Sequence, residues 1–221
     1  MIRIPFSVYD FVGHLAAGVV LVAASTVAIG GVGALGRDST VIELVVLVVV
    51  SYVAGHVIAS FSNFILERRL TRTMLGSPTH VLFGAGRPNG WRRLFAAYLS
   101  PLPEQTIQRV LTKSGATVGV SEPGEALFYH CFGVVRQHEY PRERLATFLN
   151  LYGFTRNMSF TALTCAVILA AGALMSSDPS PTYLWVAAGC GVGVSAVLYM
   201  RFLKFYRLYS VEMYMWYAEI D

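Results

Sequence analysis

Four long hydrophobic windows alternate with polar stretches along this chain. They cover about residues 11–35, 41–66, 158–176 and 183–200. A transmembrane helix needs about 20 mostly apolar residues, because each residue rises about 1.5 Å and the hydrocarbon core is about 30 Å thick. The pattern therefore predicts an all-α polytopic membrane protein with four transmembrane helices. The first window is too long for the apolar core of a signal peptide, which favours a retained helix over a cleaved signal.

Short polar turns organise these windows into pairs. The stretches GRDST and SSDPSPT join the first pair and the second pair, and such short turns leave helices as antiparallel neighbours. We therefore predict an N-terminal transmembrane hairpin over 1–66, a helical cytoplasmic insert over 67–156, and a C-terminal hairpin with an aromatic tail over 157–221.

Within the insert, the pattern predicts several helices rather than strands. One follows Pro103 and is expected to end at a cap on Gly115. Another is expected over Glu125–His138. A further helix is expected to begin at Pro141 and to run through Arg156 into the third membrane window.

Charge gives the expected orientation. The chain is 55% hydrophobic and only 14% charged. Of its 17 Lys and Arg residues, twelve lie between Arg68 and Arg156, whereas only Arg37 lies in a loop on the opposite side. The positive-inside rule then predicts that both termini lie on the cytoplasmic side of the membrane. We expect this membrane to be a bacterial-type inner membrane. The same rule explains the net charge of +4 more simply than a nucleic-acid partner does, although that alternative stays open.

The second window contains polar residues at helical spacing. At about 100° per residue they fall on one stripe, which consists of Tyr52, His56, Ser60, Asn63 and Glu67. His56 lies about 16 Å from Glu67, near the middle of the membrane. Because lipid cannot satisfy these groups, the stripe is expected to form an interhelical hydrogen-bonded seam or to line a water-filled path.

Polar residues of two other windows are candidate partners for this stripe. The first window offers Asp10 and His14, and the third offers Asn157 and Thr161. In an antiparallel hairpin His14 is expected to meet Ser60 or Asn63 rather than His56. That expectation argues against a two-histidine metal site, and we expect neither a metal nor another cofactor.

Two further sites are expected at the membrane. Gly189 and Gly193 have the GxxxG spacing, which lets helices approach closely within one chain or between subunits of a homo-oligomer. In the insert, GWRRLFAAYL places Trp91, Arg92 and Arg93 in a segment that either lies at anionic lipid headgroups or packs on neighbouring helices. Arg156, at the cytoplasmic boundary, is expected either to anchor the helix or to bind a headgroup or ligand.

No recognised catalytic pattern is present in the sequence. It has no HExxH, no GxSxG and no P-loop, each of which places catalytic or phosphate-binding groups in a defined geometry. Its three cysteines form no CxxC pair or Cys/His cluster, which favours neither a zinc site nor a disulfide framework. We expect a protein that is not an enzyme, with an interfacial lipid-modifying activity as the alternative.

Two non-enzymatic classes of function remain. One is an oligomeric scaffold, sensor or effector subunit, whose insert couples a cytoplasmic partner or signal to the membrane. The other is an ion-conducting or membrane-permeabilising pore lined by the polar stripe, which would require an oligomer because four helices enclose little space.

The stretches YDFVGH, GHVIASFSNFILER and YGFTRNMSF resemble segments of uncharacterised small four-helix bacterial membrane proteins. Some of those proteins look like membrane partners in antiphage defence. The resemblance covers the membrane boundaries rather than the insert, and it implies a defence-linked effector or sensor. It carries over no role for any single residue.

Overall fold

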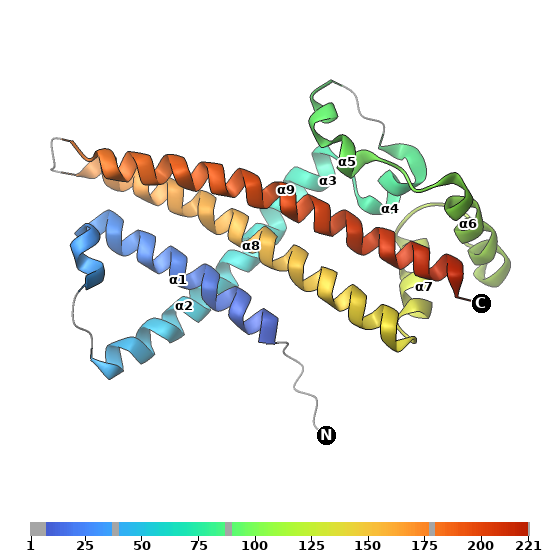
Figure 1. The fold of residues 1–221 in the computed structure, drawn as a ribbon, viewed down its shortest axis with the longest axis horizontal. Coiled ribbons are helices and arrows are strands. Elements are labelled where there is room, and N and C mark those ends of the chain that lie inside the picture. Colours follow the sequence, from blue (N-terminus) through green and yellow to red (C-terminus); the bar gives the residue numbers. More distant parts are fainter. Residues whose placement is uncertain (1–7, 37–39, 87–89, 177–179, 221) are drawn as a thin grey trace. The chain divides into compact units, whose positions relative to one another are not determined.

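The computed structural model describes residues 8–36, 40–86, 90–176 and 180–220, and within these ranges every regular element is a helix (Figure 1). The chain divides into two compact units. Unit 1 comprises residues 1–67 and 153–201, and unit 2 comprises residues 68–152 and 202–221. Residues 202–221, expected as a tail of the membrane hairpin, thus belong to unit 2.

Long apolar helices build unit 1. They are α1 (Val8–Gly30), α2 (Val41–Ser62), and the parts of α8 (Glu139–Met175) and α9 (Thr182–Glu219) that lie within the unit. The described chain has four helices that are long and apolar enough to cross a membrane. This confirms the predicted all-helical class and the four candidate spans, by length and composition.

Local sequence explains where α2 begins and how it continues. The Thr40 hydroxyl accepts a hydrogen bond from the Glu43 backbone, while the Glu43 carboxylate accepts one from the Thr40 N–H. This capping box satisfies two backbone donors that a helix start leaves open. At its other end α2 passes into a π-helix, Asn63–Thr71, which extends the polypeptide into unit 2.

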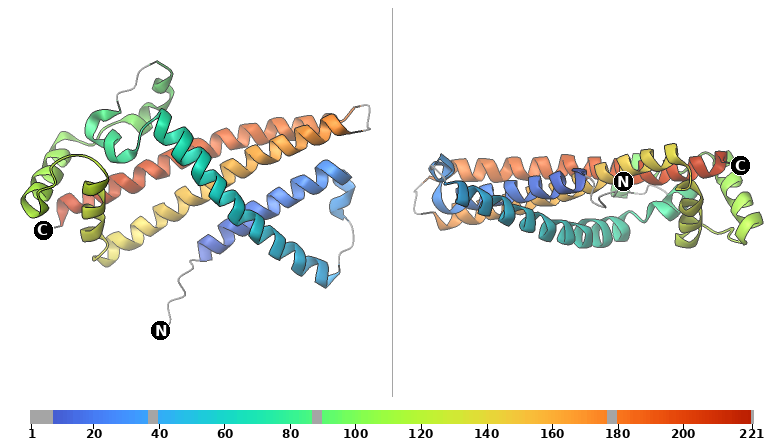
Figure 2. Two further views of the ribbon diagram at one scale, coloured as in Figure 1. Left: turned by 180° about the vertical axis from the view of Figure 1, so that it is seen from behind. Right: turned by 90° about the horizontal axis from the view of Figure 1, so that it is seen from below.

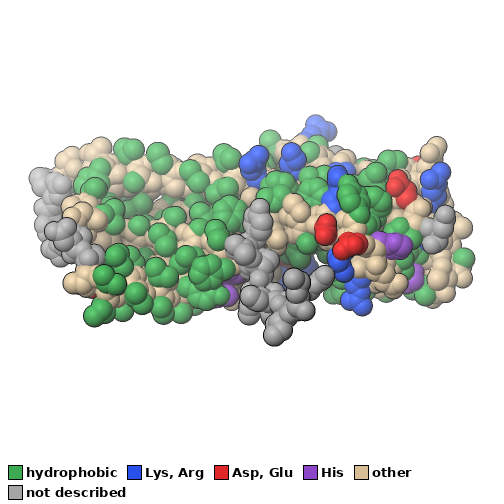
Figure 3. Space-filling model, turned by 60° about the horizontal axis from the view of Figure 1, so that its bottom comes forward, with side chains coloured by type: hydrophobic (Ala, Val, Ile, Leu, Met, Phe, Trp, Pro, Cys, Tyr) green, Lys and Arg blue, Asp and Glu red, His purple; other side chains and the backbone are tan. Residues whose placement is uncertain are grey.

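The outer surface of unit 1 is apolar, and its interior combines leucines with small residues. Seven successive α2 residues from Leu44 to Val50 are exposed, and hydrophobic side chains dominate this unit's visible face (Figure 3). The buried cluster of α8 and α9 comprises Leu169, Ala173, Leu184 and Ala188. Small side chains let membrane helices approach closely, and close packing is what stabilises helix contacts in lipid.

Unit 2 contains shorter helices and the other ends of α8 and α9. Its shorter elements are α3 (Arg72–Met74), α4 (Pro78–His80), a π-helix (Val81–Ala85), a 3₁₀-helix (Gly90–Phe95), α5 (Ala96–Leu99), α6 (Glu104–Val118) and α7 (Glu125–Val135). As expected, α8 runs unbroken through Arg156. The cap expected at Gly115 is wrong, because α6 continues to Val118 and is capped by Gly119, whose φ of 71° gives the left-handed conformation that glycine tolerates.

Large side chains fill the core of unit 2. Tyr214, Tyr217 and Met213 of α9 are fully or almost fully buried, together with Leu127 and Cys131 of α7. Hydrogen bonds from side chains of α5 and α9 to backbone carbonyls also hold the loops of unit 2 in place. The Tyr98 hydroxyl donates to the Gly76 carbonyl at 2.9 Å, and Arg207 donates to the Ser100 carbonyl at 3.0 Å.

Candidate functional site

A polar cluster lies inside unit 1 at the end of α2. We call it the junction cluster, and it consists of Ser62, Asn63, Glu67, Arg156 and Asn157. Arg156 Nη1 donates to Glu67 Oε2 at 2.6 Å and to Asn63 Oδ1 at 3.3 Å. Ser62 Oγ donates to Asn157 Oδ1 at 2.7 Å. The cluster thereby joins α2 and its π-helical extension to α8.

The charges of this cluster are shielded from the surroundings. The side chain of Arg156 is 13% exposed and that of Glu67 is 7% exposed. In a poorly solvated site each charge needs the other, since removing one partner leaves an uncompensated charge. The amide oxygens of Asn63 and Asn157 provide additional acceptors within 3.4 Å of the guanidinium. The cluster is therefore a satisfied network rather than a loose surface pair.

The π-helix determines how α2 contributes to the cluster. Asn63 and Glu67 both lie in this nine-residue segment, and both accept hydrogen bonds from Arg156. A wider helical turn rotates successive side chains less than the 100° that underlies the predicted stripe. Consequently the segment from Asn63 onward follows α8, while the earlier part of the stripe has other neighbours.

The middle of α2 contacts α1 through a histidine pair. The rings of His14 and His56 stack with centroids 4.2 Å apart, and Tyr52 contacts His56 edge-on at 4.6 Å. The expectation that His14 would avoid His56 is therefore wrong. It assumed helices running alongside each other, whereas α1 and α2 cross closely at this level (Figure 2).

Glycines make this crossing possible. A Cβ added to Gly55 would lie 1.9 Å from the His14 carbonyl oxygen, and one added to Gly18 would lie 1.6 Å from that of Ser51. Neither distance is compatible with a side chain. The backbones thus touch where Gly55 precedes His56, and this contact brings the two imidazoles together.

Small residues also set the contact between α8 and α9, although not at the expected positions. Ser159 Oγ donates to the Ser195 carbonyl at 2.9 Å, and Ser195 Oγ donates to the Ser159 carbonyl at 2.8 Å. A Cβ on Gly191 would lie 3.1 Å from the Ala162 carbonyl oxygen, whereas Gly189 and Gly193 have open space around them. The intrachain contact therefore uses Gly191 and Ser195, which have the same i, i+4 spacing as the predicted pair.

The remaining predicted residues are separate from these contacts. Thr161 is buried but donates to the Asn157 carbonyl of its own helix. Ser60 is exposed and donates to the His56 carbonyl. Arg92 donates to the Leu75 carbonyl at 2.9 Å, and Arg93 is exposed. The side chains of Asp10 and Trp91 lie outside the described part of the structure.

The segment GWRRLFAAYL, expected either at lipid headgroups or packed on neighbouring helices, is not one continuous α-helix. It is a 3₁₀-helix over Gly90–Phe95 followed by the short α5. Leu94 is 77% exposed, whereas Tyr98 is only 4% exposed. These two side chains therefore have different environments.

Sequence reasoning missed the glycine crossing, Ser62 and the Ser159–Ser195 pair. A small-residue spacing was visible for Gly191 and Ser195, but the run GCGVGVSA contains a competing spacing two residues away. Ser62 carried no signal because it falls off the 100° stripe. Gly18 and Gly55 lie on different helices, so only the tertiary structure shows their common role.

Cys131 of α7 is buried in surroundings that disfavour its thiolate. Cys131 is fully buried, and burial raises the pKa of its thiol to about 12. The reactive form of a cysteine is the thiolate, so Cys131 is chemically inert at neutral pH. No group of three or more His, Cys, Asp or Glu side chains able to hold a metal occurs among residues 8–36, 40–86, 90–176 and 180–220.

Comparisons with known proteins provide no relative from which a role could be transferred. No protein-family model, curated protein or solved structure matches the chain.

Proposed function

We propose that this protein is a membrane-embedded sensor or scaffold subunit, in which unit 2 receives a cytoplasmic partner or signal and unit 1 responds within the membrane. The observation that carries the proposal is the continuity of α8 and α9. Each is one helix that contributes residues to both units. A helix resists bending between its hydrogen-bonded turns, so a change at one end has a direct covalent route to the other.

The junction cluster supports this role by its place in the sequence. Glu67 is the last residue before the chain leaves unit 1, and Arg156 follows three residues after the chain re-enters at Gly153. The chain passes between the two units at three points, after residues 67, 152 and 201. The ion pair therefore connects, inside unit 1, the segments next to the first two of these points. If the junction cluster has two conformations, a partner can shift the equilibrium between them only by the difference in its affinity for the two.

Orientation is part of the proposal. The basic residues of the region from Arg68 to Arg156 favour a cytoplasmic unit 2 and cytoplasmic termini in a bacterial-type inner membrane. A cysteine at the exposed position Arg142 tests it in intact cells. We expect this cysteine to react with a membrane-permeant thiol reagent but not with an impermeant one. Reaction with the impermeant reagent would indicate the opposite orientation, with unit 2 outside the cytoplasm.

Coupling between the units is tested by perturbing one and observing the other. Leu127→Ala should loosen the core of unit 2. We expect it to increase amide hydrogen exchange around residues 58–66 of unit 1 in nanodiscs. In a chain that also carries Arg156→Met and Glu67→Leu, this transmitted increase should disappear. If Leu127→Ala alone leaves the amide hydrogen exchange of residues 58–66 unchanged, the coupling role is refuted.

A pore is the second candidate, and exposed polar residues in α2 favour it. His56 and Ser60 lie within an apolar span and are exposed on unit 1. If assembled chains enclose these residues in a wet path, His56→Leu should abolish ion flux in vesicles and leave assembly intact. Flux equal to that of the unchanged protein would eliminate this candidate.

The defence setting of the proposal depends on the sequence resemblance alone. We propose that the chain acts beside a cytoplasmic partner in antiphage defence. Expression of its native operon should then lower phage plating efficiency, and Arg156→Met should remove the protection. Equal plating with and without the intact operon, against a broad phage panel, would contradict the assignment.

A further inference from the structure

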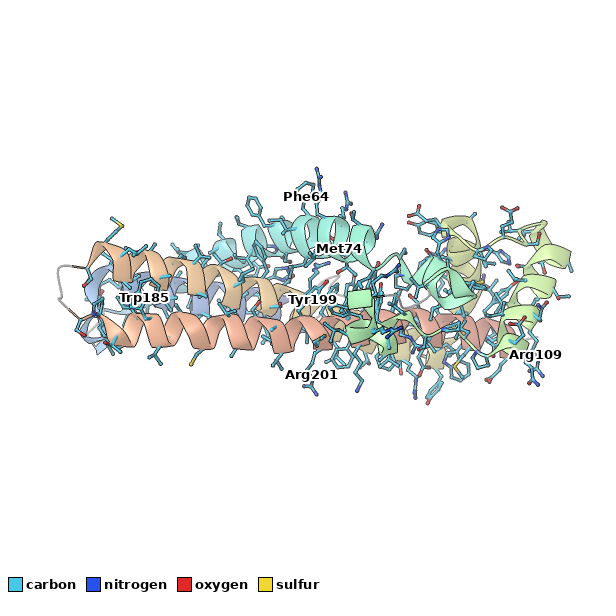
Figure 4. The ribbon with its side chains drawn as sticks, turned by 90° about the horizontal axis from the view of Figure 1, so that it is seen from above. Phe64, Met74, Arg109, Trp185, Tyr199 and Arg201 are labelled. Atoms are coloured by element: carbon cyan, nitrogen blue, oxygen red, sulfur yellow. The ribbon has the colours of Figure 1, made fainter. Side chains whose placement is uncertain are left out.

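The outward face of α2 has an unusual composition for a membrane span. His56 and Ser60 are both exposed there, one helical turn apart. Exposed apolar side chains accompany them, namely Val53, Val57, Phe61 and Phe64. Phe64, one turn beyond Ser60, points away from the neighbouring helices (Figure 4). This face therefore presents hydrogen-bonding groups to the surroundings of unit 1.

The fold holds His56 at this surface. The contact between Gly55 and the His14 backbone fixes the position of α2, and the His14 and Tyr52 rings pack against the His56 imidazole. Within the described ranges, no side chain or backbone group hydrogen-bonds to the His56 ring nitrogens. The described residues of unit 1 therefore leave the imidazole nitrogens available to a further partner.

Lipid is a poor partner at this depth. His56 is about 16 Å along the helix from Glu67, beyond the reach of headgroups, and hydrocarbon offers no hydrogen bond. The His56 imidazole both donates and accepts, whereas the Ser60 hydroxyl, which donates its hydrogen to the His56 carbonyl, can still accept. A surface that carries both groups is complementary to itself, as an interface around a two-fold axis requires.

We infer that a second copy of this chain docks on α2 around His56 and Ser60. The surrounding valine and phenylalanine side chains supply the packing that membrane helix contacts need. The open glycines of α9, Gly189 and Gly193, make a weaker candidate because lipid covers glycine without leaving a polar side chain unpaired. This inference stands independently of the coupling between the two units.

Oxidative cross-linking of the full chain in native membrane vesicles tests the inference. The reporter is Ser60→Cys in a chain that also carries Cys190→Ser, since Cys190 is the exposed native cysteine. The control is Val167→Cys in the same background, because Val167 is 63% exposed but belongs to α8 rather than to α2. We expect a disulfide-linked dimer from the reporter and none from the control.

A second substitution isolates the histidine. His56→Leu should lower the dimer yield of the reporter by about tenfold, which corresponds to the loss of one or two interhelical hydrogen bonds. His56→Asn, which retains a donor and an acceptor, should restore most of the yield. Gel filtration of each variant in detergent excludes misfolding as the cause.

Three outcomes would overturn the inference. The first is a reporter that gives no dimer, or a dimer that His56→Leu leaves unchanged. The second is cross-linking through native Cys190 alone, which would move the interface to α9. The third is modification of Ser60→Cys by an impermeant thiol reagent without dimer formation, which would identify a water path at this face.

Discussion

The two units of this protein are held together by different means. In unit 1, helices meet at glycines, alanines and serines, and a buried ion pair joins α2 to α8. In unit 2, tyrosine, methionine and leucine side chains fill a compact core. Aromatic rings such as those of Phe83 and Tyr214 meet edge-to-face within it, with centroids 5.0 Å apart.

We propose that this contrast reflects the solvent of each unit, which is lipid for unit 1 and water for unit 2. In water, large apolar side chains stabilise a core because burial removes them from the solvent. Lipid gives no such gain, so contacts between membrane helices depend on close approach and hydrogen bonds. Substitutions should therefore have opposite rankings in the two units. Polar and glycine positions should dominate in unit 1, and large apolar positions should dominate in unit 2.

The largest effect is expected at the ion pair of unit 1. Arg156→Met leaves the Glu67 carboxylate without its partner and should lower the free energy of unfolding by about 3–5 kcal/mol. Combining it with Glu67→Leu should recover most of the loss. Arg144→Met, which breaks the exposed pair with Glu212, should cost no more than about 1 kcal/mol. Unfolding by SDS titration in mixed micelles measures the free energy of unfolding of these three variants. If Arg156→Met and Arg144→Met lower it equally, the buried ion pair is no more important to unit 1 than the other pair is to unit 2.

Next in size is a cavity in unit 2. Leu127 is fully buried, so Leu127→Ala should cost about 2–5 kcal/mol. Leu174→Ala changes the same residue type on the surface of unit 1, where the side chain is 76% exposed, and should cost within about 0.5 kcal/mol. Thermal unfolding followed by circular dichroism compares them. A larger loss from Leu174→Ala would show that apolar area governs unit 1 as well.

A smaller loss is expected at the crossing of α1 and α2. Gly55→Ala places a methyl group where only 1.9 Å is available to the His14 carbonyl oxygen, and overpacking of this kind costs about 1–3 kcal/mol. Gly193→Ala has open space and should be neutral or stabilising by up to about 1 kcal/mol. Melting temperatures in detergent compare the pair. Equal tolerance at the two glycines would mean that the crossing does not need contact between backbones.

The smallest expected difference concerns two serines of α2. Ser62→Ala removes the hydroxyl that donates to Asn157 and should cost about 0.5–1.5 kcal/mol. Ser60 donates only to a carbonyl of its own helix, so Ser60→Ala in detergent-solubilised monomer should cost within about 0.5 kcal/mol. Chemical denaturation of both variants measures the difference. The reverse order would indicate that the junction cluster contributes little.

Patterns with a single physical cause were predictable from the sequence. Apolar length alone identified the four candidate spans, and the missing break between Pro141 and the third window identified the long α8. The cap of α6 was misplaced because Gly115 and Gly119 are equally acceptable in sequence. Only the observed left-handed conformation at Gly119 distinguishes them.

The candidate site was only partly predictable, because it depends on how helices cross. Periodicity placed His56 and Glu67 on one stripe, yet His56 contacts α1 and Glu67 contacts α8. The change of partner follows from the steep crossing at Gly55 and from the π-helix beginning at Asn63. Both are tertiary or non-α features, and a constant rotation of 100° per residue cannot express them.

The π-helix also bears on how the length of this chain can vary. Deleting one residue from an α-helix rotates everything beyond the deletion by about 100°. Because a π-helix closes its hydrogen bonds one residue further along than an α-helix, losing one residue between Asn63 and Thr71 can be absorbed by tightening that turn. This segment is therefore the place in the second span where a single-residue deletion would best preserve the orientation of both flanking regions.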